Sequence, residues 1–298
     1  MKKYVIVSDS CCDLNEEMRK KFGVEYVPMH FNCEGKEYLA DLDWKELSAQ
    51  DFYDMMRAGK RFLTSQVLAA QYEEAFEKYI QAGYDVLSIS CSSALSASVK
   101  ASYAVRDALQ EKYPDAKIYC IDALNACAGL GMICVMASEL RAQGKSIDEV
   151  AAWVEENKLK VNQECTVESL AYLKKAGRVS AASAFFGGLL SVKPIIISDA
   201  RGQNFALEKV KGRATSMERV AERLYQDFGD STYNKIFLAH ADCERDAELL
   251  KTAILRRFEG KEMEVYTGYI GPIVGATVGP GTLGAYVFGN EVTVNKGE

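Results

Sequence analysis

Apolar and polar residues alternate along the first half of the chain in a way that predicts strands and helices in turn. Short apolar runs predict buried strands, and the stretches between them carry apolar residues three and four apart, as amphipathic helices do. The predicted strands cover 3–7, 25–31, 85–90 and 117–121. Helices are predicted to begin near Asp13, Asp43, Ser48, Thr64, Ser96, Asn125 and Ser146. This alternation predicts an α/β layer with a largely parallel sheet.

The pattern changes after about Lys160, where shorter strands mix with helices. Strands are predicted at 161–167, 194–198, 204–210, 235–239, 263–270 and 283–288, and helices at 168–175, 180–190, 216–227 and 243–258. Residues 200–202 predict a hairpin turn, and a glycine-rich turn is predicted before the last strand. We therefore expect an N-terminal α/β/α domain over residues 1–160 and a C-terminal α+β domain over residues 161–298. No Pro/Gly/Ser linker separates them, which favours a packed interface with a cleft.

Composition narrows the class of protein. The chain has 298 residues, of which 48% are hydrophobic and 26% charged, so it can bury a sizeable core in about two domains. The net charge of −6 and the lack of a dense Lys/Arg block argue against nucleic acid as a partner. The longest nearly apolar run, 126–137, is shorter than the ~20 residues of a membrane span, and the run 4–7 is too short for a signal peptide. We expect a cytoplasmic protein without an integral membrane segment.

Nine cysteines and two histidines offer little metal chemistry. The cysteines are scattered and odd in number, no CxxC pair occurs, and two histidines cannot complete a zinc ligand set. Core packing is the favoured interpretation of the thiols, and unpaired thiols are typical of a reducing compartment. We expect no metal site and no cofactor.

Motifs of catalysis and of nucleotide binding are weak. Residues 279–284 match the dinucleotide pattern GxGxxG, but a strand pattern follows where that motif needs a helix, so a tight turn is the better interpretation. The chain contains no GxSxG and no HExxH. His30 within a predicted strand and His240 after one fit ordinary core or capping roles. We therefore assign no catalytic residue.

Two hydroxyl-rich segments suggest an anion site. Thr64 and Ser65 open one predicted helix, and residues 92–98, SSALSAS, precede another directly after a strand. Backbone N–H groups and hydroxyl donors at the positive end of a helix suit a carboxylate or a phosphate. Ordinary N-capping explains the same residues, and the residues alone favour that interpretation. Arg178, between a helix end and the next helix start, either reaches a carboxylate or is an ordinary surface residue.

Six segments occur in the same order as the motifs of one protein family. Residues 9–14, DSCCDL, resemble DSxxDL, and residues 64–66, TSQ, resemble the start of TSQP. Residues 92–98 are similar to SSGLSGT, and residues 170–180, LAYLKKAGRVS, to LxYLKKGGRIS. Residues 189–194, LLSVKP, resemble LLxIKP, and residues 270–281, IGPIVGATVGPG, resemble IGPVIGxHxGPG. Over nearly its whole length the chain resembles the DegV family of bacterial fatty-acid-binding proteins.

The resemblance implies two domains with one long-chain fatty acid buried between them, and no catalysis by the chain itself. Carried over by position, Thr64 and Ser96 would hydrogen-bond the carboxylate, with Ser65 and the backbone at Ala97 beside them, and Arg178 would lie near the head group or a partner surface. Some members present the acyl carboxylate to a separate ATP-dependent fatty acid kinase. Thr277 stands where the family has histidine, so it can donate a hydrogen bond but cannot carry charge.

Two other functions stay open at this point. A serine acyl hydrolase would use Ser93 or Ser96 as its nucleophile and would need a base beside it. A binder of a small phosphorylated metabolite would use the same two hydroxyl-rich segments.

Overall fold

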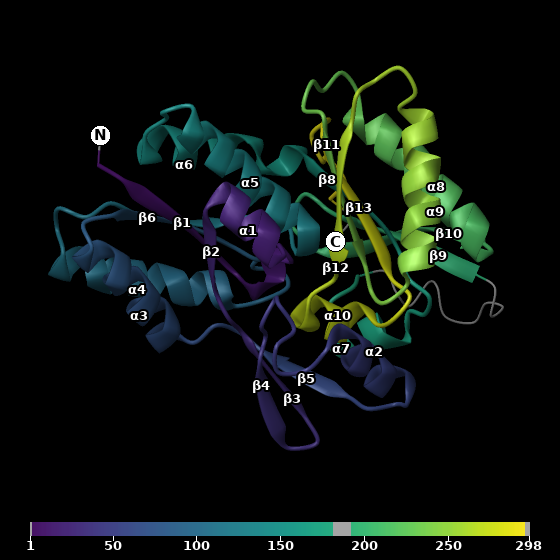
Figure 1. The fold of residues 1–298 in the computed structure, drawn as a ribbon, viewed down its shortest axis with the longest axis horizontal. Coiled ribbons are helices and arrows are strands. Elements are labelled where there is room, and N and C mark those ends of the chain that lie inside the picture. The colour runs from purple at the N-terminus through teal and green to yellow at the C-terminus, as the bar shows by residue number, and fades with distance from the viewer. Residues whose placement is uncertain (1, 181–191, 296–298) are drawn as a thin grey trace.

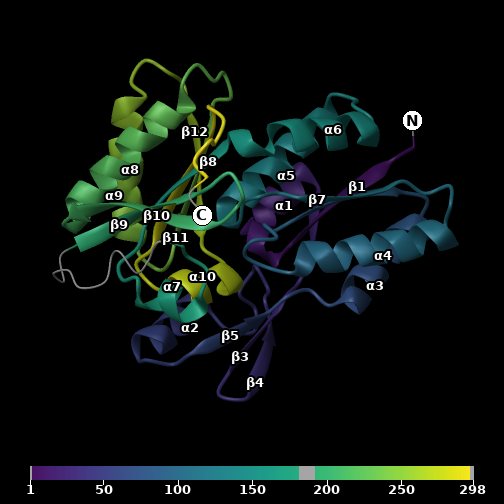
Figure 2. The same ribbon diagram turned by 180° about the vertical axis from the view of Figure 1, so that it is seen from behind.

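The computed structural model describes residues 2–180 and 192–295, whose strands form three sheets. The first sheet has four parallel strands in the order β2-β1-β6-β7 (Figures 1 and 2). Its strands are β1 (Tyr4–Asp9), β2 (Val24–Val27), β6 (Asp85–Ser90) and β7 (Ile118–Asp122). The helices α3 (Ala69–Gln81) and α4 (Ser98–Lys112) cover one face, and α1 (Glu16–Phe22), α5 (Cys127–Ala142) and α6 (Ile147–Asn157) lie on the other side. The predicted α/β/α layer with a parallel sheet is confirmed.

The second large sheet has six strands in the order β10-β9-β8-β13-β11-β12 and is mixed, because only β11 and β12 run parallel. Its strands are β8 (Val161–Thr166), β9 (Val192–Ser198), β10 (Asn204–Lys211), β11 (Lys235–His240), β12 (Glu264–Tyr269) and β13 (Leu283–Phe288). The helices α8 (Arg213–Phe228) and α9 (Glu244–Arg257) pack on it. The predicted hairpin of β9 and β10 and the predicted mixture of hairpins and helices are confirmed.

Helix α5 lies between the two large sheets and contacts strands of both. Twelve of its sixteen residues are buried, among them Gly131 and Met132. A helix that is apolar all round must be covered on all sides, and this sequence meets that need by placing α5 at the centre. One core cluster accordingly joins Ile6 and Leu87 of the first sheet to Phe237 and Tyr286 of the second.

The third sheet is a small antiparallel one that projects away from the rest of the molecule (Figures 1 and 2). It consists of β3 (His30–Cys33), β4 (Lys36–Leu39) and β5 (Phe62–Ser65), and α2 (Ala49–Arg57) connects its last two strands. The prediction of one strand over 25–31 is wrong, because the chain leaves β2 at Val27 and starts β3 at His30. Pro28 lies between them and has no N–H to continue a ladder.

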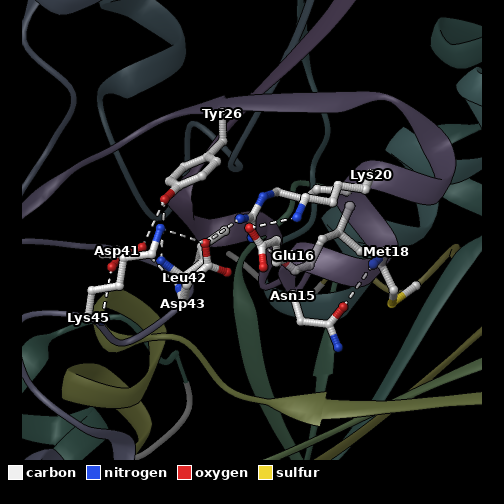
Figure 3. A network of polar contacts seen from close by, with 11 residues as sticks. Asn15, Glu16, Met18, Lys20, Tyr26, Asp41, Leu42, Asp43 and Lys45 are labelled. Carbon is white, nitrogen blue, oxygen red and sulfur yellow. Dashed lines mark hydrogen bonds and ion pairs between the residues drawn. The ribbon is translucent and has the colours of Figure 1, made fainter.

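Two of the predicted helix starts near the N-terminus are also wrong. Asn15, not Asp13, caps α1, and its side-chain oxygen accepts the Met18 N–H at 2.9 Å (Figure 3). No helix begins at Asp43. Instead the Asp41 carboxylate accepts the N–H groups of Asp43 and Lys45, a turn that Asp favours (Figure 3). Ser48 and Ser146 do cap α2 and α6 as predicted.

The two hydroxyl-rich segments differ from their predicted local structure. Thr64 and Ser65 belong to β5 and pair with Phe31 and His30, and α3 begins only at Ala69. Threonine is β-branched, which suits a strand. The second segment does precede a helix, although α4 starts at Ser98 and not at 96.

Four further short helices lie in the described part of the chain, three of them between the larger elements. These are η1 (Ser10–Cys12), η2 (Lys158–Lys160) and α7 (Ala171–Ala176). The glycine-rich segment predicted as a turn contains a fourth, α10 (Pro272–Val278), with proline at its first position, where the missing N–H costs nothing. The helix predicted over 180–190 falls almost wholly outside the described residues. Among the residues that are described, none of the helices has the length and apolar character that a membrane crossing requires.

Candidate functional site

A cavity of about 410 Å³ lies where β5, the loop after β6 and α10 come together. All six residues predicted from the resemblance line it, namely Thr64, Ser65, Ser96, Ala97, Arg178 and Thr277. They come from β5, from the segment before α4, from the end of α7 and from α10. We call this space the head-group cavity. Its walls combine residues more than 200 positions apart in the sequence, which is why no local pattern could have revealed it.

A pair of serines forms the polar wall before α4. The Ser96 and Ser98 hydroxyl oxygens are 2.9 Å apart, and the buried Ser98 hydroxyl also accepts the Val67 N–H at 3.1 Å. Because Ser98 can accept from Val67 and donate to Ser96, the Ser96 proton is left free to donate into the cavity. Ala97 is the N-cap residue of α4 and has no side chain to cap it. The positive end of a fifteen-residue helix therefore adjoins the cavity.

Two threonines on different elements, Thr64 on β5 and Thr277 on α10, line the cavity. Thr64 is exposed on β5, and Thr277 on α10 makes a long 3.4 Å bond to the Ile273 carbonyl oxygen. Ser65 donates to the His30 carbonyl oxygen at 3.4 Å, so its hydroxyl is only weakly engaged. These hydroxyls can therefore turn toward a ligand at little cost.

Arg178 is held at the rim by its backbone surroundings. It follows Gly177, whose left-handed φ of 68° ends α7. The Arg178 side chain donates to the Leu95 carbonyl oxygen at 3.5 Å and to the Ala176 carbonyl oxygen. The Asn204 side chain donates to the Arg178 carbonyl oxygen at 3.2 Å. The guanidinium is exposed and bonds carbonyl oxygens, so its charge is available to an anion.

A second, larger cavity of about 790 Å³ meets the first at Thr64, Arg178 and Thr277. We call it the outer cavity. Its wall also carries four further cations, which are Arg57, Lys60, Arg61 and Lys175. Arg57 pairs with Asp242 and Lys60 with Glu34, whereas no carboxylate in the described part of the chain pairs with Arg61, Lys175 or Arg178. A basic wall in a protein of net charge −6 is a local feature that suits an anionic group.

A third space leads inward from the head-group cavity. It holds only about 30 Å³ and shares Ala126, Asn204, Val274 and Val278 with the first cavity. Its other walls are mostly apolar and include Leu173, Ile196, Ile270 and Tyr286. From the first cavity to this space the lining changes from hydroxyls to apolar side chains, which is the change of polarity that an amphiphile with one polar end needs.

Two acids lie behind the head-group cavity. The Asp9 carboxylate accepts the N–H groups of Cys11 and Cys91 at 2.9 and 2.8 Å, and both of these cysteines line the cavity. Burial raises the pKa of Asp9 to about 6, although the two amide donors counter part of that rise. Burial also raises the pKa of the Asp13 carboxyl to about 7. Sequence reasoning assigned neither acid a role at the site, only a helix cap to Asp13, and their burial could not be deduced from the motif.

The thiols and histidines do not provide a catalytic group here. All nine cysteines are free, and eight are buried, which fits their predicted role in packing. The hydrogen bond with Cys91, together with burial, raises the pKa of Cys11. The same hydrogen bond lowers the pKa of Cys91, but burial and nearby carboxylates outweigh it, so neither is a ready thiolate. His30 and His240 are both outside the cavity wall, so Ser93 and Ser96 have no imidazole base beside them.

Comparison with known proteins places these features in context. The model of the DegV family, described as an uncharacterised protein family, matches residues 3–290. A DegV domain-containing protein of Clostridium perfringens is 38% identical over 290 residues, which cover 97% of this chain and 99% of that protein.

Two solved structures resemble the fold closely. A Thermus thermophilus DegV family protein, described by its fatty acid binding, has a TM-score of 0.85 and 25% identity over 97% of this chain and 100% of its own. DegV of Bacillus subtilis, described as a fatty acid binding protein, has a TM-score of 0.81 and 26% identity over 96% and 99% of the two chains.

Proposed function

Because this chain belongs to the DegV family, we propose that it binds one long-chain fatty acid and performs no catalysis of its own. The observation that carries the proposal is the meeting of Thr64, Ser96 and Thr277 at a polar mouth that continues into an apolar interior. The fatty acid binding described for the Thermus thermophilus and Bacillus subtilis relatives supports it. The free thiols are compatible with a reducing compartment, and we propose that the protein acts in the cytoplasm.

The carboxylate of the ligand would lie against neutral donors. Ser96 and Thr64 would each donate a hydroxyl hydrogen, the Ala97 amide would add a third donor, and the positive end of α4 would favour the negative charge. Thr277 can donate a further bond from α10. Such donors are necessary because the desolvation of an unpaired buried carboxylate would cancel much of the free energy gained by burying the acyl chain.

The acyl chain would supply most of the affinity. Each buried methylene contributes ~0.8 kcal/mol, so a chain of ~15 methylenes could contribute on the order of 12 kcal/mol before the costs of binding. The narrow space between α5, α10 and the six-stranded sheet leads in the direction that such a tail would take. We propose that the tail enters there, between the unit formed by residues 1–160 and that formed by residues 161–298.

We further propose that the outer cavity presents the carboxylate to an ATP-dependent fatty acid kinase. The two cavities meet at Thr64 and Thr277, so a group that enters the outer cavity would approach the carboxylate directly. Arg61, Lys175 and Arg178 would face the phosphate groups of the kinase nucleotide. The same cations also favour a second candidate, in which the chain binds a small phosphorylated metabolite.

Mass spectrometry and titration separate these functions. Native mass spectrometry of protein purified from cells is expected to show an added mass of fatty-acid size. In titrations with oleate, the double variant Thr64→Ala/Ser96→Ala is expected to bind at least tenfold more weakly, which corresponds to about 1.4 kcal/mol. The matched control Thr252→Ala/Ser231→Ala lies on α9 and in the loop before β11, so its affinity should match the wild type.

The opposite results would reject the proposal. Equal affinity for oleate in the double variant would place the carboxylate elsewhere. Thermal stabilisation by inorganic phosphate, without any by oleate, would favour the metabolite binder, since a true ligand raises stability with its concentration.

A further inference from the structure

The carboxyl group of Asp13 occupies an unusual position behind the ligand site. Asp13 follows η1 with a left-handed φ of 48°, and both of its carboxyl oxygens are buried without a protein hydrogen-bond partner. Burial raises the pKa of this carboxyl, and the Cys127 thiol and the Gly271 N–H that face it lower the pKa by less, so the protonated form is favoured.

Asp13 is packed against the residue at which α10 begins, and α10 carries part of the head-group cavity wall. A Cβ placed on Gly271 would lie only 2.3 Å from Asp13 Oδ1, so the carboxyl is packed directly against that glycine. Gly271 is the N-cap residue of α10, and Ile273, Val274 and Thr277 of this helix line the head-group cavity. A change at Asp13 can therefore reach the ligand site through one short helix.

Helix α10 has little freedom on its other sides. A Cβ on Gly275 would lie 2.4 Å from the Tyr53 hydroxyl oxygen, and that hydroxyl donates to the Ile270 carbonyl oxygen at 2.6 Å. Figure 1 shows α10 beside α2 and α7, both of which it contacts. Because α2 and Tyr53 pack tightly against one side of α10, a change in the position of this helix is expected on the side that contacts Asp13.

A small cavity of about 10 Å³ adjoins Asp13 and Thr267, and the buried Thr267 hydroxyl also lacks a partner. That volume is about the size of one water molecule. An ionised Asp13 could draw a water into this space or pull the Gly271 N–H toward itself. Either response changes the packing at the start of α10.

The charges around Asp13 leave Asp9 as the one neighbour that also titrates near neutral pH. The pKa of every surrounding thiol and phenol is raised, so they are neutral at pH 7. The cause is first the hydrogen bond with Cys91 for Cys11, and burial for the others, which at Cys91 outweighs the lowering by Cys11. The groups are Cys11, Cys12, Cys91, Cys127, Tyr53 and Tyr286, with Tyr266 on β12. From α1, Arg19 is engaged by the Leu14 carbonyl oxygen and by Asp43. No cation of the described chain is among the groups that act on Asp13.

We propose that Asp13 is a positioning residue for the ligand site, and that its bound proton keeps α10 seated so that Thr277 and its neighbours can receive an anionic head group. The inference rests on the proposed function, because it concerns the same site. A ligand carboxylate adds a negative charge in front of Asp9 and Asp13, so binding favours the protonated form of both acids. Ligand binding is therefore coupled to proton uptake.

Isothermal titration calorimetry tests this coupling on the wild-type protein. Oleate is titrated at pH 6, 7 and 8 in buffers with different ionisation enthalpies, so that the buffer dependence of the heat reports protons taken up. We expect uptake at pH 7 to 8 and an affinity that falls as pH rises; a rise of one unit in the pKa of an acid on binding corresponds to at most ~10-fold in affinity. A carboxylic acid in water has a pKa of about 4.3, so the free ligand is ionised throughout.

Variants identify the group that takes up the proton. Asp13→Asn is expected to lose most of the uptake and to flatten the pH dependence of affinity, and Asp9→Asn measures the share of the second acid. Asp107→Asn, at an exposed site on α4, should behave as the wild type. Uptake that persists undiminished in Asp13→Asn would assign the proton to the ligand or to Asp9 and would overturn the proposal.

The outcomes separate this inference from the proposed function. Oleate binding without any proton uptake, at an affinity independent of pH, would reject the role of Asp13 while leaving fatty-acid binding intact. Absence of oleate binding at every pH would reject the proposed function itself. The absence of proton uptake by the wild type is enough to reject the role of Asp13, so the proposal can still be overturned if a variant fails to fold.

Discussion

At the scale of single residues, the site depends on how hydrogen-bond donors are shared between neighbours. Ser98 accepts from the Val67 N–H and lies 2.9 Å from Ser96, so it determines in which direction the Ser96 hydroxyl can donate. Ser98 stands within a motif that the sequence shows plainly, yet its role follows only from the contact with Val67, which is 31 positions away. A residue outside the cavity lining can thus orient a residue of the lining.

Replacing Ser98 should separate binding from stability. Ser98→Ala is expected to weaken oleate binding several-fold, because Ser96 loses its partner, and to lower the free energy of unfolding by about 1 kcal/mol, because the Val67 N–H is left unpaired. Ser102→Ala is the matched control, since this buried serine on the same helix donates to the Val99 carbonyl oxygen at 2.7 Å. Urea unfolding and oleate titration of both variants provide the comparison. Similar affinity losses in the two variants would show that Ser98 acts through general stability only.

At the scale of elements, the hairpin of β9 and β10 supports the loop that forms the polar wall. Its turn contains Gly202 with a φ of +73°, and a Cβ there would lie 2.2 Å from Ser92 Oγ and 2.8 Å from Leu124 Cα. Ser198 on the same hairpin donates to the Leu124 carbonyl oxygen at 3.1 Å. The second half of the chain therefore holds in place a loop that belongs to the first.

Substitution of Gly202 should damage binding as well as folding. Gly202→Ala is expected to lower the free energy of unfolding by more than ~1 kcal/mol and to weaken oleate binding, because the added methyl group pushes against Ser92. Gly83→Ala is the control, since Gly83 has a φ of +85° and nothing within 4 Å of its Cβ position. It shares the backbone strain and lacks the contact. If both variants bound oleate like the wild type, the hairpin would have no role at the site.

Long buried elements could be predicted from the sequence because their burial requires runs of apolar residues that are visible locally. The strands β6 and β13 have the predicted bounds. β13 is a continuous apolar run, and β6 combines apolar residues with small buried serines, so that both are buried along nearly their whole length. Two errors arose where the deciding contact is distant. Thr64 resembles a helix cap, but its pairing with Phe31 places it in a strand, and the glycines around α10 conceal a helix that only Pro272 signals.

The candidate site was predictable in its residues but not in its shape. Motif resemblance identified Thr64, Ser96, Arg178 and Thr277, and the structure brings them to one cavity. The outer cavity, the support from Ser98 and the acids behind the site depend on packing between distant segments, which no single pattern records. Their roles in binding stay predictions until a ligand is titrated.

At the scale of the whole molecule, buried acids should make stability depend on pH. The pKa of Asp13 rises from 3.8 to about 7 on folding, and that of Asp9 from 3.8 to about 6, because burial disfavours their charged forms. Between those values the folded protein holds protons that the unfolded chain releases. The free energy of unfolding contributed by these groups therefore falls as pH rises from about 4 to about 7.

This dependence can be measured as a difference between the wild type and Asp13→Asn. The variant has no proton to lose at this position. Relative to the wild type, its free energy of unfolding should therefore increase by about 3 kcal/mol between pH 5 and pH 8, since two pH units lie between 5 and the pKa of about 7 and each contributes ~1.4 kcal/mol. Urea unfolding at several pH values measures the difference, and Asp107→Asn should run parallel to the wild type. Parallel curves for Asp13→Asn as well would mean that Asp13 is ionised in the folded protein at pH 5, and that a donor or a water reaches its carboxylate.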